Sequence, residues 1–475
     1  MNLRFIVFTC ILFTFALCQD AGLYVQISQT GLDYLSNLAQ KAVPQMVKTR
    51  AIADTETTGF KMKNFTIEHF SPPQIHSSFV ADTGIASELL LPYTLITANY
   101  EAGFGWWYKS GSLKAKLTNL QLQMLLSLEK DNRSQPTVSI PLCNGTAEDF
   151  SVVFSGGFSR FLNAVRGFVQ SYLQHELDTI VCELTVKATR MFSDAQNSFD
   201  PTMLCQHSQH FDLNFDLSVD PQFTNKHAVL GFEGGKRRKN GQLQSVKGPR
   251  TLGIVPKGRR MISLVISEYT ANSILAQLKE SNKFGRFSTS VSADDFPDWI
   301  GSLLTVLCSG CQLRLSAELT KAPTVVVSKW RGVYLLVEGK SKVVLEDGPY
   351  VNMFLINGDV KFTINVKPYV RFGLVHGKIR LTNVDVKVRR GGFGGLLGNA
   401  VKGLLKTLVP RQLWTEIKKT LQVPLHQQGI KLPVLCGVEL SNSSIGYIDH
   451  AVTIDTDISY NLEKFIERWQ NVDKD

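Results

Sequence analysis

Two clusters of cysteine and histidine have the residue types that metal or redox chemistry needs. Cys205, His207 and His210 lie within six residues, and thiolate with imidazole is a donor set that zinc prefers. Because the pattern is short, and because a cysteine of an exported chain is expected to be oxidised or buried, we expect no metal there. Cys308 and Cys311 form a Cys-x-x-Cys pair, which is redox-active in a thioredoxin-like βαβ setting. No such setting surrounds them, so the pattern favours a structural disulfide.

The sequence offers little that could act as a hydrolase. A serine nucleophile elbow needs Gly-x-Ser-x-Gly, and the nearest match, around Ser159, has Phe161 where the second glycine should stand. Neither a His-Glu-x-x-His zinc motif nor a phosphate-binding loop occurs. We therefore predict a protein without catalysis. A secreted lipid-acting hydrolase stays the alternative, since catalytic partners need not be close in sequence.

The positive charge is concentrated in one segment. The chain has a formal net charge of +10, and residues 234–260 contain nine lysines and arginines and no acid. Such a segment can be a solvated linker, an electrostatic contact for anionic headgroups, lipopolysaccharide or sulfated glycans, or a site of proteolytic processing. Few apolar residues are available to bury in residues 234–251, which we expect to form an exposed linker.

The first residues have the pattern of a secretory signal. Residues 1–18 combine Arg4, an apolar run from Phe5 to Leu17, and small residues at the expected cleavage site. No later stretch reaches the ~18 to 20 apolar residues of a spanning helix, so we expect an exported, extracellular protein with no nucleic-acid partner. Glycosylation sequons then become meaningful, and they stand at Asn64, Asn132, Asn144 and Asn442.

The chain contains an internal repeat. The phrase at residues 156–169 returns at residues 391–405 with the same Gly-Gly-Phe opening and the same Asn-Ala-Val. A weaker match relates a β-type run that ends at Ser28 to one that ends at Ser267, an offset of 239 residues. The mature length also suits two domains of roughly 200 residues. We therefore predict two similar halves.

Each half has the pattern of a short helix, a run of strands and a long helix. Serine is a good helix cap, and a helical period follows it in both halves, before Pro44 in the first. Residues 60–155 and 286–390 alternate between apolar and polar side chains and are broken by turn residues. The repeated phrase opens a longer apolar stripe in each half, over residues 158–191 and 397–421.

These patterns predict an α+β fold in which amphipathic helices cover one face of an antiparallel sheet. Two further segments alternate strictly, one at residues 211–219 and one near the end, at residues 452–460. Both lie outside the helix, strand, helix units. We expect them to pair in a sheet that links the two halves.

Three features resemble the bactericidal/permeability-increasing and lipopolysaccharide-binding protein family. They are the start at residues 25–34, the second opening at residues 264–269, and a Cys143 and Cys182 pair before and within the first long helix. The resemblance covers about residues 23–460. It implies an elongated boomerang of two pseudo-symmetric barrels, each a twisted antiparallel sheet with a short and a long helix, joined by a central sheet. The N-terminal barrel would span residues 19–233, the C-terminal barrel residues 252–460, and a tail residues 461–475.

The resemblance changes how the apolar helix stripes are interpreted. Periodicity alone favours plain core, whereas the family implies slots for phospholipid acyl chains, which gain ~0.8 kcal/mol for each buried methylene. Bound phospholipid is then the ligand, and no cofactor is implied. The residues expected to line the first slot are Leu35, Leu38, Phe161, Val165 and Phe168, and those of the second are Ile274, Leu397, Val401, Leu404 and Leu408.

Family members that bind lipopolysaccharide are similar in clustering cations at the tip of the first barrel. Here the matching regions hold few cations, beside an aromatic run that either inserts at a membrane interface or caps the barrel end. The expected membrane or headgroup contacts are Lys48, Arg50, Trp106, Trp107, Lys109, Lys114 and Lys116.

The resemblance also implies a disulfide between Cys143 and Cys182. Cys205, Cys308, Cys311 and Cys436 leave three connectivities open. The function expected is binding and transfer of phospholipid, with transient contact to a membrane or lipoprotein surface. The alternative among binding proteins is an innate-immune recogniser of bacterial lipopolysaccharide.

Overall fold

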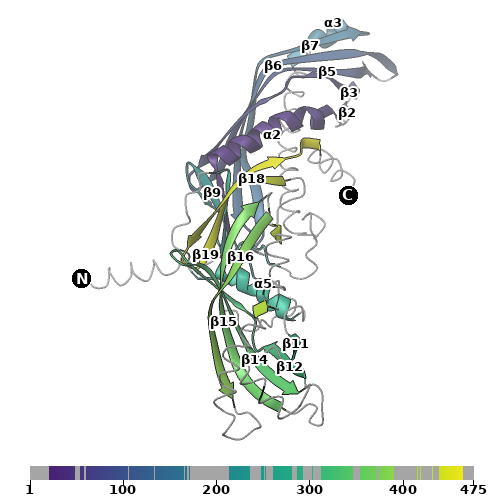
Figure 1. Cartoon of the computed structure of the whole chain (residues 1–475). Helices are drawn as coiled ribbons and strands as arrows, with labels where there is room; N and C mark the ends of the chain where they lie inside the picture. Colours follow the sequence, from purple (N-terminus) through teal and green to yellow (C-terminus); the bar gives the residue numbers. More distant parts are fainter. Residues whose placement is uncertain are drawn as a thin grey trace, which may run out of the picture.

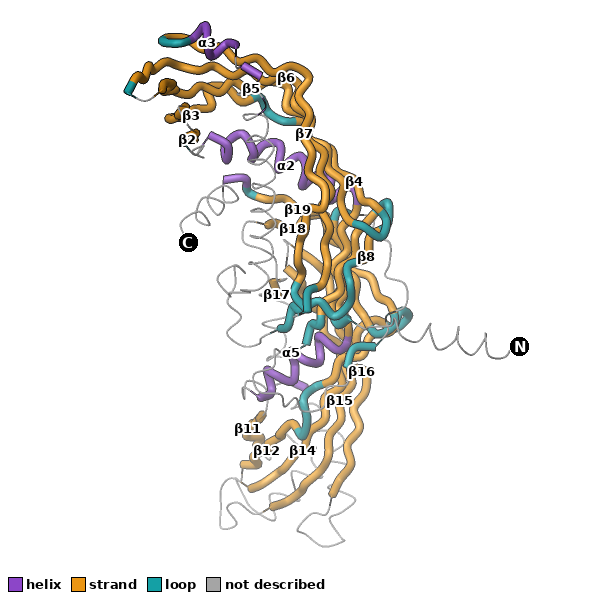
Figure 2. The backbone as a smooth tube through the Cα atoms, turned by 180° about the vertical axis from the view of Figure 1, so that it is seen from behind, coloured by secondary structure: helices purple, strands orange, loops and turns teal. Residues whose placement is uncertain are grey.

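Three antiparallel sheets follow one another along a curved, elongated molecule (Figure 1). The computed structural model describes residues 21–48, 54–57, 60–104, 106–132, 134–164, 166–167, 171, 213–235, 248–250, 252, 260–280, 286–292, 302, 312–345, 354–371, 374–389, 414–415, 418, 430–431 and 438–463. The helices within these ranges are α2 (Gln29–Lys48), α3 (Ser159–Ala164) and α5 (Glu268–Glu280). Figures 1 and 2, seen from opposite sides, both show α2 and α5 on the concave side of the sheets.

The strands that open the two halves pair with each other at the centre of the molecule. β1 (Leu23–Ser28) runs antiparallel to β10 (Ile262–Ser267), with Val25 opposite Leu264. The repeat offset of 239 residues relates these same two positions. Each strand therefore faces its own repeat equivalent across a local twofold axis.

The hydrogen bonds that flank this pair follow the same symmetry. The Ser28 amide donates to the carbonyl of Met261, and the Ser267 amide donates to the carbonyl of Gly22, at 3.0 Å in both cases. Met261 and Gly22 are themselves 239 residues apart. The duplication predicted from the sequence is thus visible in individual backbone contacts.

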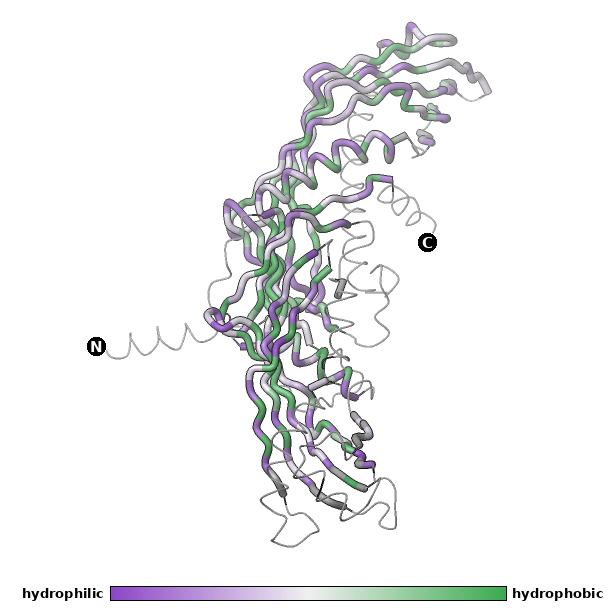
Figure 3. Tube along the Cα trace, viewed as in Figure 1, coloured by the Kyte–Doolittle hydropathy of each residue, from purple (hydrophilic) through white to green (hydrophobic). Residues whose placement is uncertain are grey.

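Hairpins on either side complete the central sheet. Its strand order is β18-β19-β10-β1-β9-β8, with β8 (Gln222–Phe223), β9 (His227–Phe232), β18 (Val438–Ile448) and β19 (Ala451–Tyr460) around the central pair. Hydrophobic residues concentrate along these strands (Figure 3). Because β19 comes from the end of the chain, the sheet that links the halves is the one expected from the alternation at residues 452–460.

A larger sheet extends from each side of the central one. The N-terminal sheet has the order β2-β3-β5-β6-β7, with β4 beside β5, and comprises β2 (Thr55–Thr57), β3 (Phe60–Phe70), β4 (Gln74–Val80), β5 (Gly84–Phe104), β6 (Trp107–Lys130) and β7 (Pro136–Gly156). The C-terminal sheet has the order β11-β12-β14-β15-β16-β17, with β13 beside β14, and comprises β11 (Arg286–Ser292), β12 (Gln312–Leu319), β13 (Thr324–Ser328), β14 (Gly332–Leu345), β15 (Phe354–Arg371), β16 (Leu374–Arg389) and β17 (Ile430–Lys431). The predicted α+β boomerang, two similar halves joined by a central sheet, is confirmed.

Alternation in the N-terminal sheet changes phase once, at the same level in two strands. In β6 the buried positions are odd-numbered up to Leu117 and even-numbered from Leu120, and in β5 they are odd-numbered from Ser87 to Leu91 and even-numbered from Thr94. Asn119 adopts a left-handed φ of 50° at this step. One inserted residue in each strand changes which alternate side chains point inward. Because both strands gain a residue at the same level, the pairing between them continues in register.

The segment at residues 211–219 was expected to be a regular strand, but its described part, residues 213–219, is not one. Leu213 and Leu217 occupy only isolated bridge positions, the latter opposite Phe232 of β9. The backbone runs beside β9 and makes irregular hydrogen bonds beyond that strand's end, so it never enters a continuous ladder. The strict alternation of apolar and polar residues therefore corresponds here to a segment at the edge of a sheet.

The start of the predicted linker is not exposed. Gly234 and Gly235 are buried, and the Asn214 amide donates to the Gly235 carbonyl at 2.7 Å. Gly234 has a φ of 69°, and a Cβ there would lie 2.5 Å from the Thr270 hydroxyl, so this close approach requires glycine. Residues 236–247, with the first basic cluster, lie outside the described residues.

The helices differ in part from the sequence pattern. α2 continues through Pro44 to Lys48, one turn beyond the predicted stripe. The first long helix begins as predicted, at Ser159, and α3 is followed by helical positions at residues 166, 167 and 171. The rest of that helix, and the second one apart from residues 414, 415 and 418, lie outside the described residues.

Equivalent serines cap α2 and α5. The Ser28 hydroxyl accepts the Gly31 amide at 3.2 Å, and the Ser267 hydroxyl accepts the Thr270 amide at 3.2 Å. Each serine thus satisfies one of the otherwise unpaired amides at a helix start.

We expect Ser28→Ala and Ser267→Ala each to lower the free energy of unfolding by about 1 kcal/mol, because each loses its capping hydrogen bond. Chemical denaturation measures the change. Ser112→Ala, at an exposed position in β6, is the control and should stay within about 0.5 kcal/mol of the wild type. Equal stability of all four proteins would contradict the capping role.

The carboxylate of Asp457 on β19 accepts hydrogen bonds from the residues that precede β10. Asp457 accepts hydrogen bonds from Arg260 Nη1 at 2.8 Å, from Asn442 Nδ2 at 3.1 Å and from the Met261 amide at 3.3 Å. Burial alone would raise the pKa of Asp457, but the three donors and the charge of Arg260 together hold that pKa below its ordinary value.

A lowered pKa in the folded state means that Asp457 contributes stability above its unfolded pKa, near 3.8, and that this contribution is lost as the pH falls further. We therefore expect Asp457→Asn to be less stable than the wild type at neutral pH, with the difference closing in acid. Thermal unfolding across pH measures it. Asp220→Asn, at an exposed position, should follow the wild type throughout; a constant deficit for Asp457→Asn would contradict the ionic role.

Candidate lipid-binding slots and membrane-contact tip

The inner face of the N-terminal sheet is a continuous apolar wall. Side chains from β3, β5, β6 and β7 pack together there with Leu162 of α3, which is 3% exposed. The buried members are Met62, Ile96, Ala98, Tyr100, Ala102, Leu113, Ala115, Leu117, Phe150, Val152, Phe154 and Leu162. Through Leu162, the first turn of the long helix packs against the sheet.

The repeated Gly-Gly-Phe phrase forms the turn from β7 into α3. Gly156 has a φ of 103° and Phe158 a φ of 61°, which only a glycine or a constrained residue adopts readily. The Tyr100 hydroxyl donates to the Gly157 carbonyl at 2.7 Å, and burial raises the pKa of this hydroxyl, which keeps it a donor. A Cβ at Gly157 would lie 2.7 Å from the Lys109 side chain. The phrase therefore fixes the angle at which the long helix leaves the sheet.

Helix α2 packs on β4 through polar side chains. The Ser36 hydroxyl donates to Ser77 Oγ at 2.9 Å, and Gln40 Nε2 donates to the Ile75 carbonyl at 3.0 Å. Because β4 is an edge strand, these side chains satisfy backbone and hydroxyl groups that no further strand pairs. The side of the helix pressed against the sheet edge is thus partly polar.

Helix α5 repeats this arrangement on β13. Asn272 donates to the Val325 carbonyl at 3.2 Å and accepts the Val325 amide at 2.6 Å. The fully buried residues of α5 are Thr270, Ser273 and Gln277, all polar. This differs from the expected burial of its apolar side. Asn272 bonds the edge strand, whereas the Thr270 hydroxyl accepts the Ser267 hydroxyl at 3.4 Å and the buried Ser273 hydroxyl has no hydrogen-bond partner among the described residues.

The predicted slot residues of both helices are left incompletely covered. Leu35 is 39% exposed, Leu38 is half-buried, and Ile274, the repeat equivalent of Leu35, is half-buried. By contrast, Leu32 and Ala42 of α2 are buried. In both halves an apolar edge of the helix therefore remains available beside the packed face.

An exposed aromatic tip closes the β5–β6 hairpin. Trp106, Trp107 and Tyr108 are 91%, 61% and 51% exposed. We call these three residues the aromatic tip; they lie at the far end of the N-terminal sheet from the central one (Figure 1). Indole and phenol rings favour the interface between water and lipid, where an apolar ring and a polar group are both accommodated.

The predicted cations near this tip do not share one face. Alternation along β6 places Lys114 and Lys116 on the face opposite to Lys109. Lys109 Nζ lies 5.4 Å from the centre of the Phe158 ring, and Lys116 Nζ lies 5.5 Å from that of Tyr93. Lys109 and Lys116 thus contact separate aromatic rings.

Several predicted site residues cannot be placed. The side chains of Phe161 and Lys48 are not among those described, although both residues belong to described helices. Those that lie outside the described residues altogether are Arg50, Val165, Phe168, Leu397, Val401, Leu404 and Leu408. Their roles stay predictions.

Cys143 on β7 is disulfide-bonded. Cys182, the partner that the family resemblance implies, lies outside the described residues, so this pairing stays a prediction.

All four predicted glycosylation sites are exposed. Asn64 and Asn442 both adopt left-handed φ values, 55° and 50°, at β-bulges in β3 and β18, and Asn132 and Asn144 lie in the N-terminal half. Exposure leaves each side chain accessible, and glycosylation itself stays a prediction.

Within the part of the chain that the structure describes, no three histidine, cysteine or acidic side chains gather in a way that could hold a metal ion. Among those same residues, no helix is both long and apolar enough to cross a bilayer.

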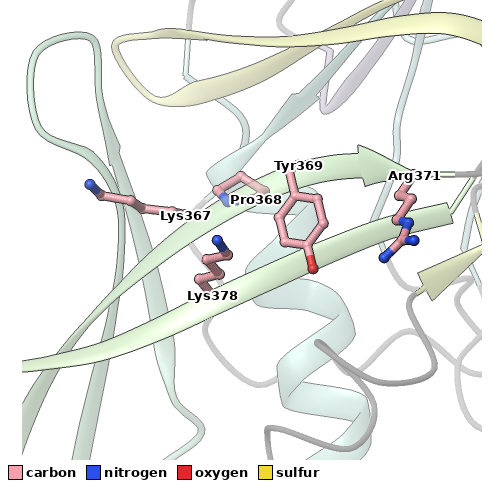
Figure 4. A pocket seen from close by; sticks show the side chains of 5 residues that line it. All are labelled: Lys367, Pro368, Tyr369, Arg371 and Lys378. Carbon is pink, nitrogen blue, oxygen red and sulfur yellow. The ribbon is translucent and has the colours of Figure 1, made fainter.

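A cationic pocket in the C-terminal half was not anticipated from the sequence. It is an open hollow of about 450 Å³, lined by Lys367, Pro368, Tyr369, Arg371 and Lys378 from β15 and β16 (Figure 4). The available signal was the even spacing of Lys367 and Arg371, four residues apart in one strand segment, with Lys378 in the next segment after a short turn, because even spacing places side chains on one face of a strand. The contiguous basic segment at residues 234–260 is the more conspicuous feature of the charge pattern.

The three sheets, with one short helix on each half, define an elongated protein of two similar halves. Two family models match the chain: the N-terminal domain of the LBP / BPI / CETP family over residues 31–194 and the C-terminal domain of the same family over residues 206–460. The chain belongs to this family, whose members bind or transfer lipids and act without catalysis.

Individual relatives agree with this assignment. The chain is similar to nose resistant to fluoxetine protein 5 of Caenorhabditis elegans, with 25% identity over 95% of this chain and 92% of that protein. It is 20% identical to the bactericidal permeability-increasing protein of Sebastes schlegelii, over 54% of this chain and 55% of that one. The crystal structure of lipopolysaccharide binding protein has the same fold, with a TM-score of 0.50, 14% identity, and coverage of 93% of this chain and 99% of that chain.

We expect the double variant Trp106→Ser/Trp107→Ser to bind phosphatidylcholine vesicles roughly tenfold more weakly, a loss of about 1.4 kcal/mol, because two interfacial rings are removed. Vesicle flotation measures binding. Both side chains are exposed, so the melting temperature should not change. Trp330→Ser, at an 85% exposed position in the β13–β14 turn, is the control; equal losses in both proteins would contradict a specific role for the tip.

Proposed function

We propose that this protein is a secreted carrier that holds phospholipid acyl chains in apolar slots and moves them between membrane or lipoprotein surfaces. One observation carries the proposal. In both halves the short helix packs on its sheet partly through polar side chains, while Leu35 and its repeat equivalent Ile274 remain partly exposed. An apolar edge kept open at equivalent places is suited to a ligand that itself needs burial.

The mechanism follows from the geometry of the N-terminal half. The aromatic tip enters the interfacial region of a membrane, where the rings contact lipid without crossing the bilayer. A lipid acyl chain then moves to the apolar edge of α2, gaining about 0.8 kcal/mol for each methylene removed from water. The headgroup stays in solvent, so no catalytic group is needed and the lipid leaves intact.

Recognition of bacterial lipopolysaccharide is less well supported. At the tip, binding of a phosphorylated glycolipid would require a compact cationic patch, but the three described lysines there are divided between two faces of β6. We therefore favour the carrier function. The experiment that tests it also detects lipopolysaccharide binding and lipid hydrolysis.

The test is transfer of labelled phosphatidylcholine between donor and acceptor vesicles by the purified full chain, with mass spectrometry of the lipid recovered. Intact lipid in the acceptor supports the carrier. Cleaved lipid would establish the hydrolase instead. No transfer, together with saturable binding of lipopolysaccharide, would establish the recogniser.

We expect Leu35→Glu to slow transfer roughly tenfold. The carboxylate would cost the acyl chain a free energy of burial equal to that of about two methylene groups. Leu35 is 39% exposed, so folding should tolerate the change, which circular dichroism checks. Leu142→Glu, at a 50% exposed position in β7, is the matched control. Unchanged transfer by Leu35→Glu would exclude this edge of α2 from the lipid path.

A further inference from the structure

We propose that the cationic pocket on the β15–β16 hairpin binds a phosphate monoester. This site is separate from the acyl slots and does not depend on the carrier function. The pocket is formed by the five residues named above, three of which are cations and none of which is an acid. Its volume, about 450 Å³, lies within the range of small-ligand sites.

A pair of like charges lies at the pocket. Lys367 on β15 stands directly opposite Lys378 on β16 in the antiparallel ladder. Two like charges in this position destabilise a sheet. Within the part of the chain that the structure describes, no carboxylate forms an ion pair with either lysine. An anion bound between them would remove the repulsion.

The same sheet balances its cations elsewhere. Lys321 and Lys361 both pair with Glu338, at 3.1 Å each, and these pairs hold the pKa of Glu338 below its ordinary value. Further along β16, Lys387 stands opposite Asp359. The unbalanced pair is therefore a local feature of the hairpin end and not a general property of the sheet.

An aromatic pair holds one of the two ammonium groups in place. Tyr369 and His376 lie opposite each other, with their rings stacked at 5.2 Å and an interplanar angle of 16°. Lys378 Nζ lies 5.8 Å from the centre of the Tyr369 ring. His376 is only 8% exposed, so this pair is a fixed support. The ammonium is thus positioned before any ligand arrives, which lowers the entropic cost of binding.

The donor set matches a phosphate monoester. Lys367, Tyr369 and Arg371 alternate along β15 and so share the face that Lys378 occupies from β16 (Figure 4). A guanidinium can bind two phosphate oxygens at once, and the ammonium groups contribute point charge. A phosphate monoester carries about −1.5 to −2 at neutral pH and presents three acceptor oxygens, which suits one arginine and two lysines.

Two sources could supply this group, a membrane lipid headgroup or a soluble metabolite. Calorimetric titration of the full chain with glycerol 3-phosphate tests the soluble source. Flotation with phosphatidylcholine vesicles, with and without phosphatidic acid, tests the membrane source. Binding in either assay that weakens as salt is raised supports the site and identifies its source. Binding in neither overturns the proposal.

Variants separate this site from a diffuse charge effect. We expect Lys367→Ala/Lys378→Ala to weaken phosphate binding at least roughly tenfold, as expected for lost charge-assisted hydrogen bonds, and to keep or raise the melting temperature because the repulsion is gone. Lys378→Arg should keep most of the binding. Lys387→Ala, on the same strand, is the matched control, and an equal loss there would overturn the proposal. Transfer of phosphatidylcholine should be normal in the double variant, so failure of either proposal can be recognised separately.

Discussion

The pairing of β1 with β10 is the contact on which the rest of the architecture depends. It joins the first described strand of the chain to one about 240 residues later and centres the six-stranded sheet that both halves share. The same pair fixes the two helix starts, because Ser28 and Ser267 end their strands and cap α2 and α5 in equivalent ways. Its local twofold axis thereby places both helices on one side of the molecule.

The candidate surfaces use the two halves differently. The N-terminal half carries the aromatic tip on an uninterrupted hairpin of β5 and β6, whereas the C-terminal half carries a cationic pocket on the hairpin of β15 and β16. Both are ends of long two-stranded ribbons supported by a packed sheet. Duplication has thus kept the helix contacts similar. The two surfaces do not lie on equivalent hairpins, because β4 corresponds to β13 and the β15–β16 hairpin therefore corresponds to β6–β7.

Much of this fold could be predicted because its signals are local or repeated. Serine caps, alternating strands and the offset between Ser28 and Ser267 are each visible in the sequence. The change in inward-facing positions at Asn119 was not predictable, because a single inserted residue in each strand hardly alters the amino-acid composition of the segment. The polar packing of α5 was missed for a different reason: hydrophobic periodicity cannot show that the neighbour is an edge strand. The cationic pocket required knowledge of register, because only the ladder brings Lys367 opposite Lys378.

The symmetry of the central pair has a consequence for the origin and folding of the molecule. A strand that meets its own repeat equivalent about a twofold axis has the geometry of a homodimer interface, so the junction between the halves is the contact that two identical ancestral chains would have made. After fusion of those chains, the pairing of β1 with β10 takes place within one molecule, by closure of a loop, and no longer between two molecules. The first half must still wait for β10 to be synthesised, and a fragment that ends before it would expose β1 as an unpaired edge able to capture another copy of itself.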